Sequence, residues 1–356
     1  MSTETVLQSY VVAYVFWLCM SLGCFGLMLL HHVLRGRWGL VILRLLEAGS
    51  KTLPLMAIGM VPILLAYRTL YPWASPDIAA HDHVLHAKLW YLNAPFWIGR
   101  TVAFFAFWIG MTALLTRWTK AEDRTGDPDY GQKRSNVSAP GLVLYVLSVT
   151  FAFTDLVMAL EAHWFSTIWG VLFVVQQGLA AMSLVVLIVL VGSRRPPFAG
   201  LVTPALTRDL GNMLLTLTML WGYLSISQYL IIWQTNLPEE VQHFVVRQHE
   251  GWNWVATFVV IGQFFVPFLL LLSTALKRSA RMLGTVAAGI LLVRAVDVIW
   301  TVAPGFQNQA AHSVALDAAM IVTVGLAWWA WFAAARRTAA PLPSYDPRLV
   351  EAVSHA

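Results

Sequence analysis

Residues 10–33 read YVVAYVFWLCMSLGCFGLMLLHHV, an apolar stretch without a single aspartate, glutamate, lysine or arginine. At a rise of about 1.5 Å per residue, a helix of this length crosses the roughly 30 Å hydrocarbon core of a bilayer. Residues 1–7 ahead of it lack the basic segment that opens a cleavable signal peptide. We therefore expect a membrane helix that is retained in the mature protein.

Comparable apolar runs recur along the whole chain, which is 58% hydrophobic and only 12% charged. A soluble domain is nearer 45–50% apolar and about a quarter charged. The runs lack the roughly ten-residue alternating segments of a membrane barrel, so helices are the remaining way to pair the backbone in lipid. We predict an all-α integral membrane protein with about nine transmembrane helices. The expected spans are approximately 8–31, 50–71, 92–118, 139–163, 166–192, 210–235, 252–274, 281–303 and 311–334.

The basic residues predict the orientation of the chain. With nine spans, 18 of the 23 lysines and arginines lie on alternate connections and in the C-terminal tail. Because cytoplasmic loops are enriched in these residues, that side is the predicted cytoplasm. Residues 1–7 then form a short extracytoplasmic N-terminus, 8–335 the helical domain and 336–356 a cytoplasmic tail. The basic residues are dispersed rather than gathered in a stripe, which argues against nucleic acid as a partner.

Two stretches between spans have distinct expected structures. Residues 37–47 (RWGLVILRLLE) are too short to span and suit a helix lying in the plane of the inner interface. Residues 119–138 are polar and predict a flexible cytoplasmic loop. Neither stretch could hold a separate catalytic domain, so soluble chemistry would come from partner proteins.

Five ionisable residues fall within the expected spans, namely Arg100, Asp155, Arg294, Asp297 and Asp317. Counted from the span centres, all five lie roughly 3–8 Å towards the outside, in one layer. Such residues pair, face a cavity or line a path for protons. The three aspartates outnumber the two arginines, so one carboxyl is predicted to lack a cation and to exchange a proton. The inner half is expected to hold no buried carboxylate.

Each charged residue has a structural interpretation beside the functional one. Arg294 and Asp297 are i, i+3 neighbours, which favours a local ion pair. Asp155 shares a helix face with Ser148 and either belongs to a proton path or pairs with Arg100. Asp317 favours a functional role unless a third arginine is near.

Glu161 and His163, which follow the fourth span, are the remaining proton-path candidates. Their position near the interface favours a solvated helix end over a role in the proton path.

The residues offer little for a cofactor. We find no facing histidine pair for haem, and Cys19 and Cys24 form no cluster for iron and sulfur. The spacing of His81, His83 and His86 is a weak zinc pattern. We therefore expect no catalytic residue, metal or cofactor on this chain. Nine of the 17 tryptophans lie at expected outer span ends, as an aromatic belt would place them: Trp73, Trp90, Trp97, Trp164, Trp169, Trp233, Trp252, Trp254 and Trp300.

Several stretches resemble the F subunit of the bacterial alternative complex III, a quinol:electron-acceptor oxidoreductase. They include FAFTDLVMALEAHWFSTIWG at 151–170 and LWGYLSISQYLIIWQTNLPEE at 220–240, together with KLWYLNAPFWIGR at 88–100. The resemblance covers about residues 8–335. It places Asp155, Glu161 and His163 on the family's Asp, Glu and His.

The resemblance implies a fold similar to polysulfide-reductase-type membrane anchors, with two four-helix bundles plus an additional helix, in the bacterial cytoplasmic (inner) membrane. It implies a redox-inert, non-catalytic subunit that is structural and contributes an outer half-path for protons. The implied partners are a multihaem cytochrome carrying haem c, an iron–sulfur protein with its clusters, and a homologous membrane subunit that binds quinol. Two alternatives stay open: a quinone-binding anchor, with Glu161 and His163 as ligands, and a stand-alone secondary transporter.

Overall fold

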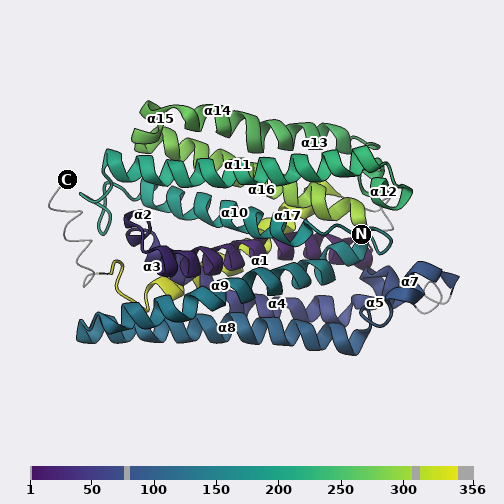
Figure 1. The fold of residues 1–356 in the computed structure, drawn as a ribbon, viewed down its shortest axis with the longest axis horizontal. Helices are drawn as coiled ribbons and strands as arrows, with labels where there is room; N and C mark the ends of the chain where they lie inside the picture. The colour runs from purple at the N-terminus through teal and green to yellow at the C-terminus, as the bar shows by residue number, and fades with distance from the viewer. Residues whose placement is uncertain (1, 76–80, 307–312, 344–356) are drawn as a thin grey trace.

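The computed structural model describes residues 2–75, 81–306 and 313–343. Within these ranges the chain forms helices and short connections and no strand. Nine helical segments there are long and apolar enough to cross a membrane, which confirms the all-α integral membrane class and the predicted number of spans (Figure 1). Five of the spans are single helices: α1 (Thr3–Leu34), α8 (Ala94–Thr125), α10 (Trp169–Val191), α11 (Pro204–Thr235) and α17 (Val314–Arg336). Two combine consecutive helices: α3 (Leu43–Ser50) with α4 (Leu53–Leu65), and α13 (Trp252–Val260) with α14 (Val266–Leu272). The other two are α9 (Asp129–Leu156) and α16 (Ala280–Val302), each extended by one 3-10 turn, to Leu160 and Gly305.

Local sequence signals fix several helix ends. The Asn93 side chain accepts the backbone N–H of Phe96 at 3.0 Å and so caps the start of α8. Thr203 caps α11 in the same way, directly before a proline in the first turn. At the other end, α8 stops at Gly126, whose φ of 69° favours glycine. These signals place the long helices where the apolar runs require them.

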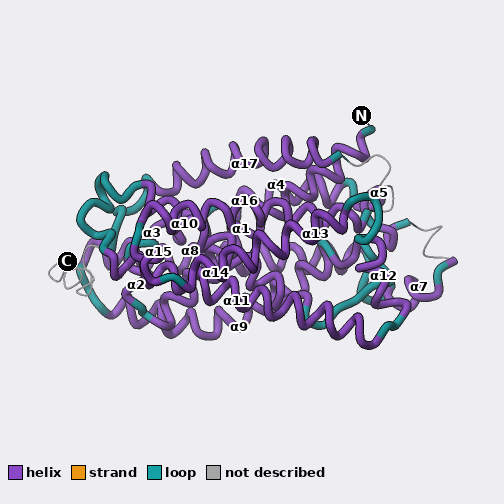
Figure 2. The backbone as a smooth tube through the Cα atoms, turned by 90° about the horizontal axis from the view of Figure 1, so that it is seen from above, coloured by secondary structure: helices purple, strands orange, loops and turns teal. Residues whose placement is uncertain are grey.

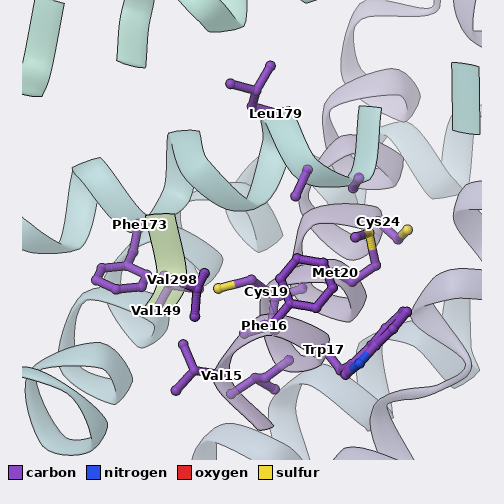
Figure 3. Packing of buried hydrophobic residues seen from close by; sticks show 14 of the residues in the cluster. Val15, Phe16, Trp17, Cys19, Met20, Cys24, Val149, Phe173, Leu179 and Val298 are labelled. Carbon is purple, nitrogen blue, oxygen red and sulfur yellow. The ribbon is translucent and has the colours of Figure 1, made fainter. Parts of the chain in front are cut away.

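Helix α1 is the centre of the molecule. Its apolar stretch is buried along its whole length, and α10, α17, α3 and α9 pack around it (Figures 1 and 2). The packing is close because small residues face the neighbours: a Cβ at Gly23 would lie 2.0 Å from the Gln177 carbonyl oxygen of α10. Figure 3 shows Cys19 and Cys24 among the core side chains, and both are buried free thiols, as their packing role predicts.

The remaining helices form two groups on either side of α1. In the first bundle, α4, α8 and α9 pack with α1; in the second bundle, α10, α11, α13–α14 and α16 pack together, and α17 lies against α1 (Figure 1). Short helices mark the two ends of the molecule. The α12 end carries α5 (Tyr67–Leu70), α7 (His83–Lys88) and α12 (Pro238–Val246), and the α2 end carries α2 (Arg37–Leu40) and α15 (Thr274–Arg278).

Two expected connections differ from the prediction. Residues 119–138 are helical except for the short break at 126–128, because α8 and α9 continue beyond their apolar runs. Residues 37–47 do not lie on the surface as an in-plane helix would. They form α2 and the beginning of α3, and the α3 residues Arg44 and Glu47 are buried against the rest of the chain.

Candidate functional site

The first expected charge pair is present in the first bundle. Arg100 donates from Nε and Nη2 to the two carboxylate oxygens of Asp155, both at 2.8 Å. Its Nη1 donates to the Tyr91 carbonyl, and the guanidinium lies 3.8 Å from the centre of the Tyr91 ring. Asp155 is therefore bound by an arginine whose donors are also engaged. Of the two interpretations of Asp155, a proton path or a pair with Arg100, the geometry favours the pair.

The second expected pair lies in the other bundle. Arg294 donates to Asp297 one turn further along α16, and both side chains are buried. Arg294 Nε has no hydrogen-bond partner in the part of the chain that the structure describes. The two ion pairs belong to different bundles, so the expected layer of charges is not one contiguous cluster.

The other expected members occupy separate positions. Asp317 is fully buried in the first turn of α17, where the helix dipole stabilises a carboxylate. Ser148 accepts the Trp108 indole N–H at 2.9 Å and donates to the Tyr145 carbonyl. No hydrogen bond between described residues joins Ser148 to Asp155.

Glu161 takes part in a cluster that the sequence did not predict. Arg247 Nη2 donates to Glu161 Oε1 at 2.7 Å, and His243 Nδ1 lies 2.9 Å from Glu161 Oε2. Arg247 also donates to the backbone carbonyls of Thr301 and His243. The cluster ties α12 to the ends of α9 and α16. It replaces the solvated helix end expected for Glu161.

The protonation states of this cluster follow from its surroundings. Burial opposes ionisation of Glu161, but His243 and Arg247 outweigh it and lower the pKa of the carboxyl to about 2. Burial and the Arg247 charge lower the pKa of His243, so its ring is neutral at pH 7. Nδ1 lies 3.0 Å from Arg247 Nη1, which only donates, and 3.0 and 2.9 Å from the two Glu161 oxygens, which only accept. Because Nη1 donates to the His243 carbonyl at 2.7 Å, we assign the proton of the neutral ring to Nδ1, where it is donated to Glu161. Nε2 is then the acceptor nitrogen of His243.

His163, the other residue expected near the end of α9, is not part of this cluster. Its side chain is half exposed, and Nε2 lies 2.6 Å from Asp82 Oδ2, beside α7. The i, i+4 spacing of His243 and Arg247 predicts that they are neighbours on one helix face. Their contact with Glu161 has no sequence signal, because they lie 82 and 86 residues away from it.

The nine tryptophans expected in the aromatic belt differ in exposure. Trp90, Trp233 and Trp254 are largely exposed, as a belt at a lipid interface predicts, and Trp300 is half-buried. The buried set consists of Trp73, Trp97, Trp164, Trp169 and Trp252. For this buried set the aromatic-belt interpretation is wrong. Trp164 stacks on the His243 ring, with centroids 4.0 Å apart, and therefore belongs to the cluster.

A cavity of about 660 Å³ opens beside the cluster in the second bundle. Helices α10, α11, α13 and α16 contribute to its walls, and His243 and Phe244 of α12 line it at the α12 end. Asp297, Gln176 and Gln228 are among its few polar lining residues. Five lining residues are also exposed on the outside of the bundle: Ile226, Tyr229, Val260, Ile261 and Phe265. The cavity therefore opens sideways between α11 and the span Trp252–Leu272.

The wall of this cavity contains unsatisfied hydrogen-bond donors. The indole N–H groups of Trp169, Trp221 and Trp300 are buried and have no partner among residues 2–75, 81–306 and 313–343. Buried polar groups in native proteins are nearly always paired with protein, water or a ligand. Three such donors among its lining residues make this cavity the candidate binding site of the second bundle.

The α2 end has its own buried charges. Arg44 donates to Glu47 at 3.0 Å and to Asp123 at 2.5 Å, and Thr119 donates to Glu47 at 2.9 Å. Glu47 is buried, which corrects the expectation that this half would hold no buried carboxylate. Its partners hold it in a structural network that joins α3 to α8.

The geometry and the comparisons define the class of this protein only coarsely. Within the described ranges, no group of three histidine, cysteine, aspartate or glutamate side chains could hold a metal ion, so the weak zinc pattern at His81, His83 and His86 gains no support. No model of a known protein family matches the sequence, and no curated protein is significantly similar to it. The structure establishes a multi-pass helical membrane protein.

Proposed function

We propose that the chain is a redox-inert membrane subunit of a quinol-oxidising electron-transfer complex, in the bacterial cytoplasmic membrane. Its main role is structural, and it contributes a half-path for protons at the α12 end. In this proposal the α12 end faces the outside and the C-terminus the cytoplasm, because the basic residues gather on the connections at the α2 end. Haem c and iron–sulfur clusters belong to partner subunits.

One observation carries the proposal. The two sequence stretches with the most specific resemblance, 151–170 and 220–240, are joined in space at the α12 end. The Trp164 indole N–H donates to the Glu240 carbonyl at 3.1 Å, and α10 packs along α11. This junction supports a common role for the two stretches rather than two unrelated similarities.

The test of complex membership is to extract the chain gently from its native membrane and to identify the proteins that remain attached. We expect an iron–sulfur protein, a multihaem cytochrome and a homologous membrane subunit in constant ratio. Recovery of the chain alone, or as an oligomer of itself, would overturn the proposal and favour a secondary transporter.

The proton half-path has a separate test in the reconstituted complex. Asp317 is the target, because it is fully buried in the first turn of α17. We expect Asp317→Asn to reduce proton release in vesicles at unchanged assembly, whereas Asp209→Asn, an exposed control, leaves it unchanged. Equal proton release in both variants would remove the transport role and leave the structural one.

A further inference from the structure

Another cavity lies at the α2 end of the molecule, where α17 ends beside α3 (Figure 1). Its volume of about 350 Å³ falls within the roughly 300–1,000 Å³ of ligand pockets. Its walls come from α3, from the last turns of α17 with the residues that follow, and from the connection after α10. The lining includes four basic residues, Arg44, Lys51, Arg336 and Arg337, and one acidic residue, Glu47.

Three of these four cations have no carboxylate beside them. Arg44 is paired with Glu47 at 3.0 Å and with Asp123 at 2.5 Å. The other three basic side chains form no ion pair with any carboxylate that the structure describes. The Lys51 ammonium donates to the Thr338 hydroxyl at 3.3 Å, which holds it at the cavity. The described lining of this cavity therefore carries an excess of three positive charges.

The position of these cations is more specific than the charge asymmetry of the loops. Enrichment of basic residues on cytoplasmic connections accounts for their number at the α2 end. It does not require three of them to line one cavity. Lys51 and Thr338, joined by their hydrogen bond, are 287 residues apart in the chain. Basic cavities between membrane helices are typical sites for anionic lipid headgroups.

The apolar part of the wall favours a lipid over a soluble anion. Leu45, Phe198 and Ala333 line the cavity, together with three more alanines at and beyond the end of α17. Trp331, one turn before this end, is 40% exposed, and its indole N–H donates to the Lys51 carbonyl at 2.9 Å. Tryptophan is enriched at the depth of the lipid headgroups. The cavity therefore lies where a headgroup and the first part of an acyl chain would be.

A phosphate group suits the three unpaired cations. Guanidinium groups bind phosphate oxygens through paired hydrogen bonds, and a lysine ammonium binds them as a compact charge. A phosphatidylcholine headgroup carries a cation of its own, which the excess positive charge of the cavity would repel. In the proposed orientation the α2 end lies at the cytoplasmic leaflet, whose anionic lipids attract basic residues.

We infer that this cavity binds the phosphate headgroup of an anionic phospholipid, whose acyl chains lie against the exposed face of α17. The inference goes beyond the proposed function and does not depend on it. The bound phosphate bridges Lys51 to Arg336 and Arg337, and so ties the end of α17 to α3.

The experiment is a titration of the full-length purified protein in detergent with dioleoyl phosphatidylglycerol, followed by the rise in its thermal unfolding midpoint. A ligand that binds only the folded state raises this midpoint in a saturable way. We expect a saturable rise with phosphatidylglycerol and none with phosphatidylcholine of the same acyl chains. Equal rises with both lipids would overturn the inference, because they would show a lipid coat without headgroup selection.

Inorganic phosphate distinguishes the two sources of the phosphate group. We expect no saturable rise with this ion over the same concentration range, because it lacks the acyl chains that the apolar wall contacts. A rise equal to that with phosphatidylglycerol would overturn the inference and identify a site for a soluble ion.

The variant that tests the cations combines Lys51→Gln, Arg336→Gln and Arg337→Gln. Each basic residue near an anionic lipid contributes about fivefold in affinity, so we expect about hundredfold weaker binding of phosphatidylglycerol. The matched control combines Arg117→Gln, Arg124→Gln and Lys133→Gln. It removes three exposed basic residues of α8 and α9 that do not line the cavity, and it should bind as the wild type does.

A charge-conserving variant separates the loss of charge from a disturbed fold. Arg336→Lys combined with Arg337→Lys keeps both charges and should retain most of the affinity. A loss as large as in the glutamine variant would overturn the inference, because charge would then not determine binding. Equal affinities in the wild type and the glutamine variant, or equal losses in that variant and its control, would overturn it as well.

Discussion

The two bundles each contain a buried Arg–Asp pair, but the space around the pairs differs. Around Asp155 of the first bundle there is a cavity of only about 20 Å³, and Arg100 is fully engaged. Asp297 of the second bundle lines a cavity of about 660 Å³, beside buried donors that have no partner among the described residues. A buried charge therefore does not by itself distinguish a candidate functional site. The distinguishing features are the unpaired hydrogen-bond donors and the cavity beside the charge.

The largest effect is expected at the cluster that closes the second bundle at the α12 end. Arg247→Met leaves the Glu161 carboxylate without its guanidinium and the backbone carbonyls of His243, Trp300 and Thr301 without this donor. Breaking a buried ion pair from one side destabilises by about 3–5 kcal/mol, and we expect the upper part of that range here. The measurement is the thermal unfolding midpoint in detergent.

Arg208→Met provides the control for this variant, since the Arg208 side chain is 43% exposed and forms an ion pair with Asp209, whose side chain is equally exposed. A midpoint shift for Arg247→Met no larger than that of the control would mean that the cluster does not hold the second bundle together.

A double variant tests whether the pair of the first bundle is only structural. Arg100→Met leaves Asp155 buried without its cation, and we expect a loss of about 3 kcal/mol in unfolding free energy. Arg100→Met combined with Asp155→Leu removes both charges and should recover most of that loss, because an apolar pair of similar size is often as stable. Assembly and proton release of the complex should then equal those of the wild type.

If the double variant is stable but proton release falls, Asp155 belongs to the proton path. That result would contradict the conclusion that the Arg–Asp pair of the first bundle is only structural.

The smallest effect is a dependence of stability on pH. The folded-state pKa of His243 is lowered by burial and by Arg247, so the unfolded state binds more protons below about pH 6.5. Stability is therefore complete above that pH and falls as the pH decreases towards the folded-state pKa. Glu161, with its pKa near 2, adds a second loss below its ordinary value of 4.5.

Thermal unfolding midpoints between pH 7.5 and about pH 5 should show this slope. His243→Gln should flatten it, because this variant removes the buried imidazole whose pKa is lowered on folding. An unchanged slope in His243→Gln would assign the pH dependence to other groups.

The sequence predicted those features that depend on neighbours along the chain. The nine spans follow from runs of apolar residues, and the Arg294–Asp297 pair follows from i, i+3 spacing within α16. The Glu161 cluster could not be predicted in the same way, because its partners His243 and Arg247 lie 82 and 86 residues away. The cavity depends on how four helices pack, which no single stretch of sequence encodes.

The error at residues 119–138 has a different cause. The polar composition of this stretch predicts a loop, but alanine, glutamate, lysine and arginine are good helix formers and extend a helix beyond its apolar run. Partly buried ion pairs then hold these extensions in place: Arg134–Glu122 joins α9 to α8, and Arg44–Asp123 joins α3 to α8.

The central position of α1 has a consequence for biosynthesis. Helix α1 is enclosed partly by α17, which is synthesised much later: the Trp17 indole donates to the Ile321 carbonyl at 2.8 Å, and the Trp328 indole to Ser21 at 2.9 Å. These contacts join residues about 300 positions apart. Until α17 has been inserted, α1 must keep that face in lipid or against a chaperone, so a chain truncated before residue 314 would present it to the quality-control machinery of the membrane.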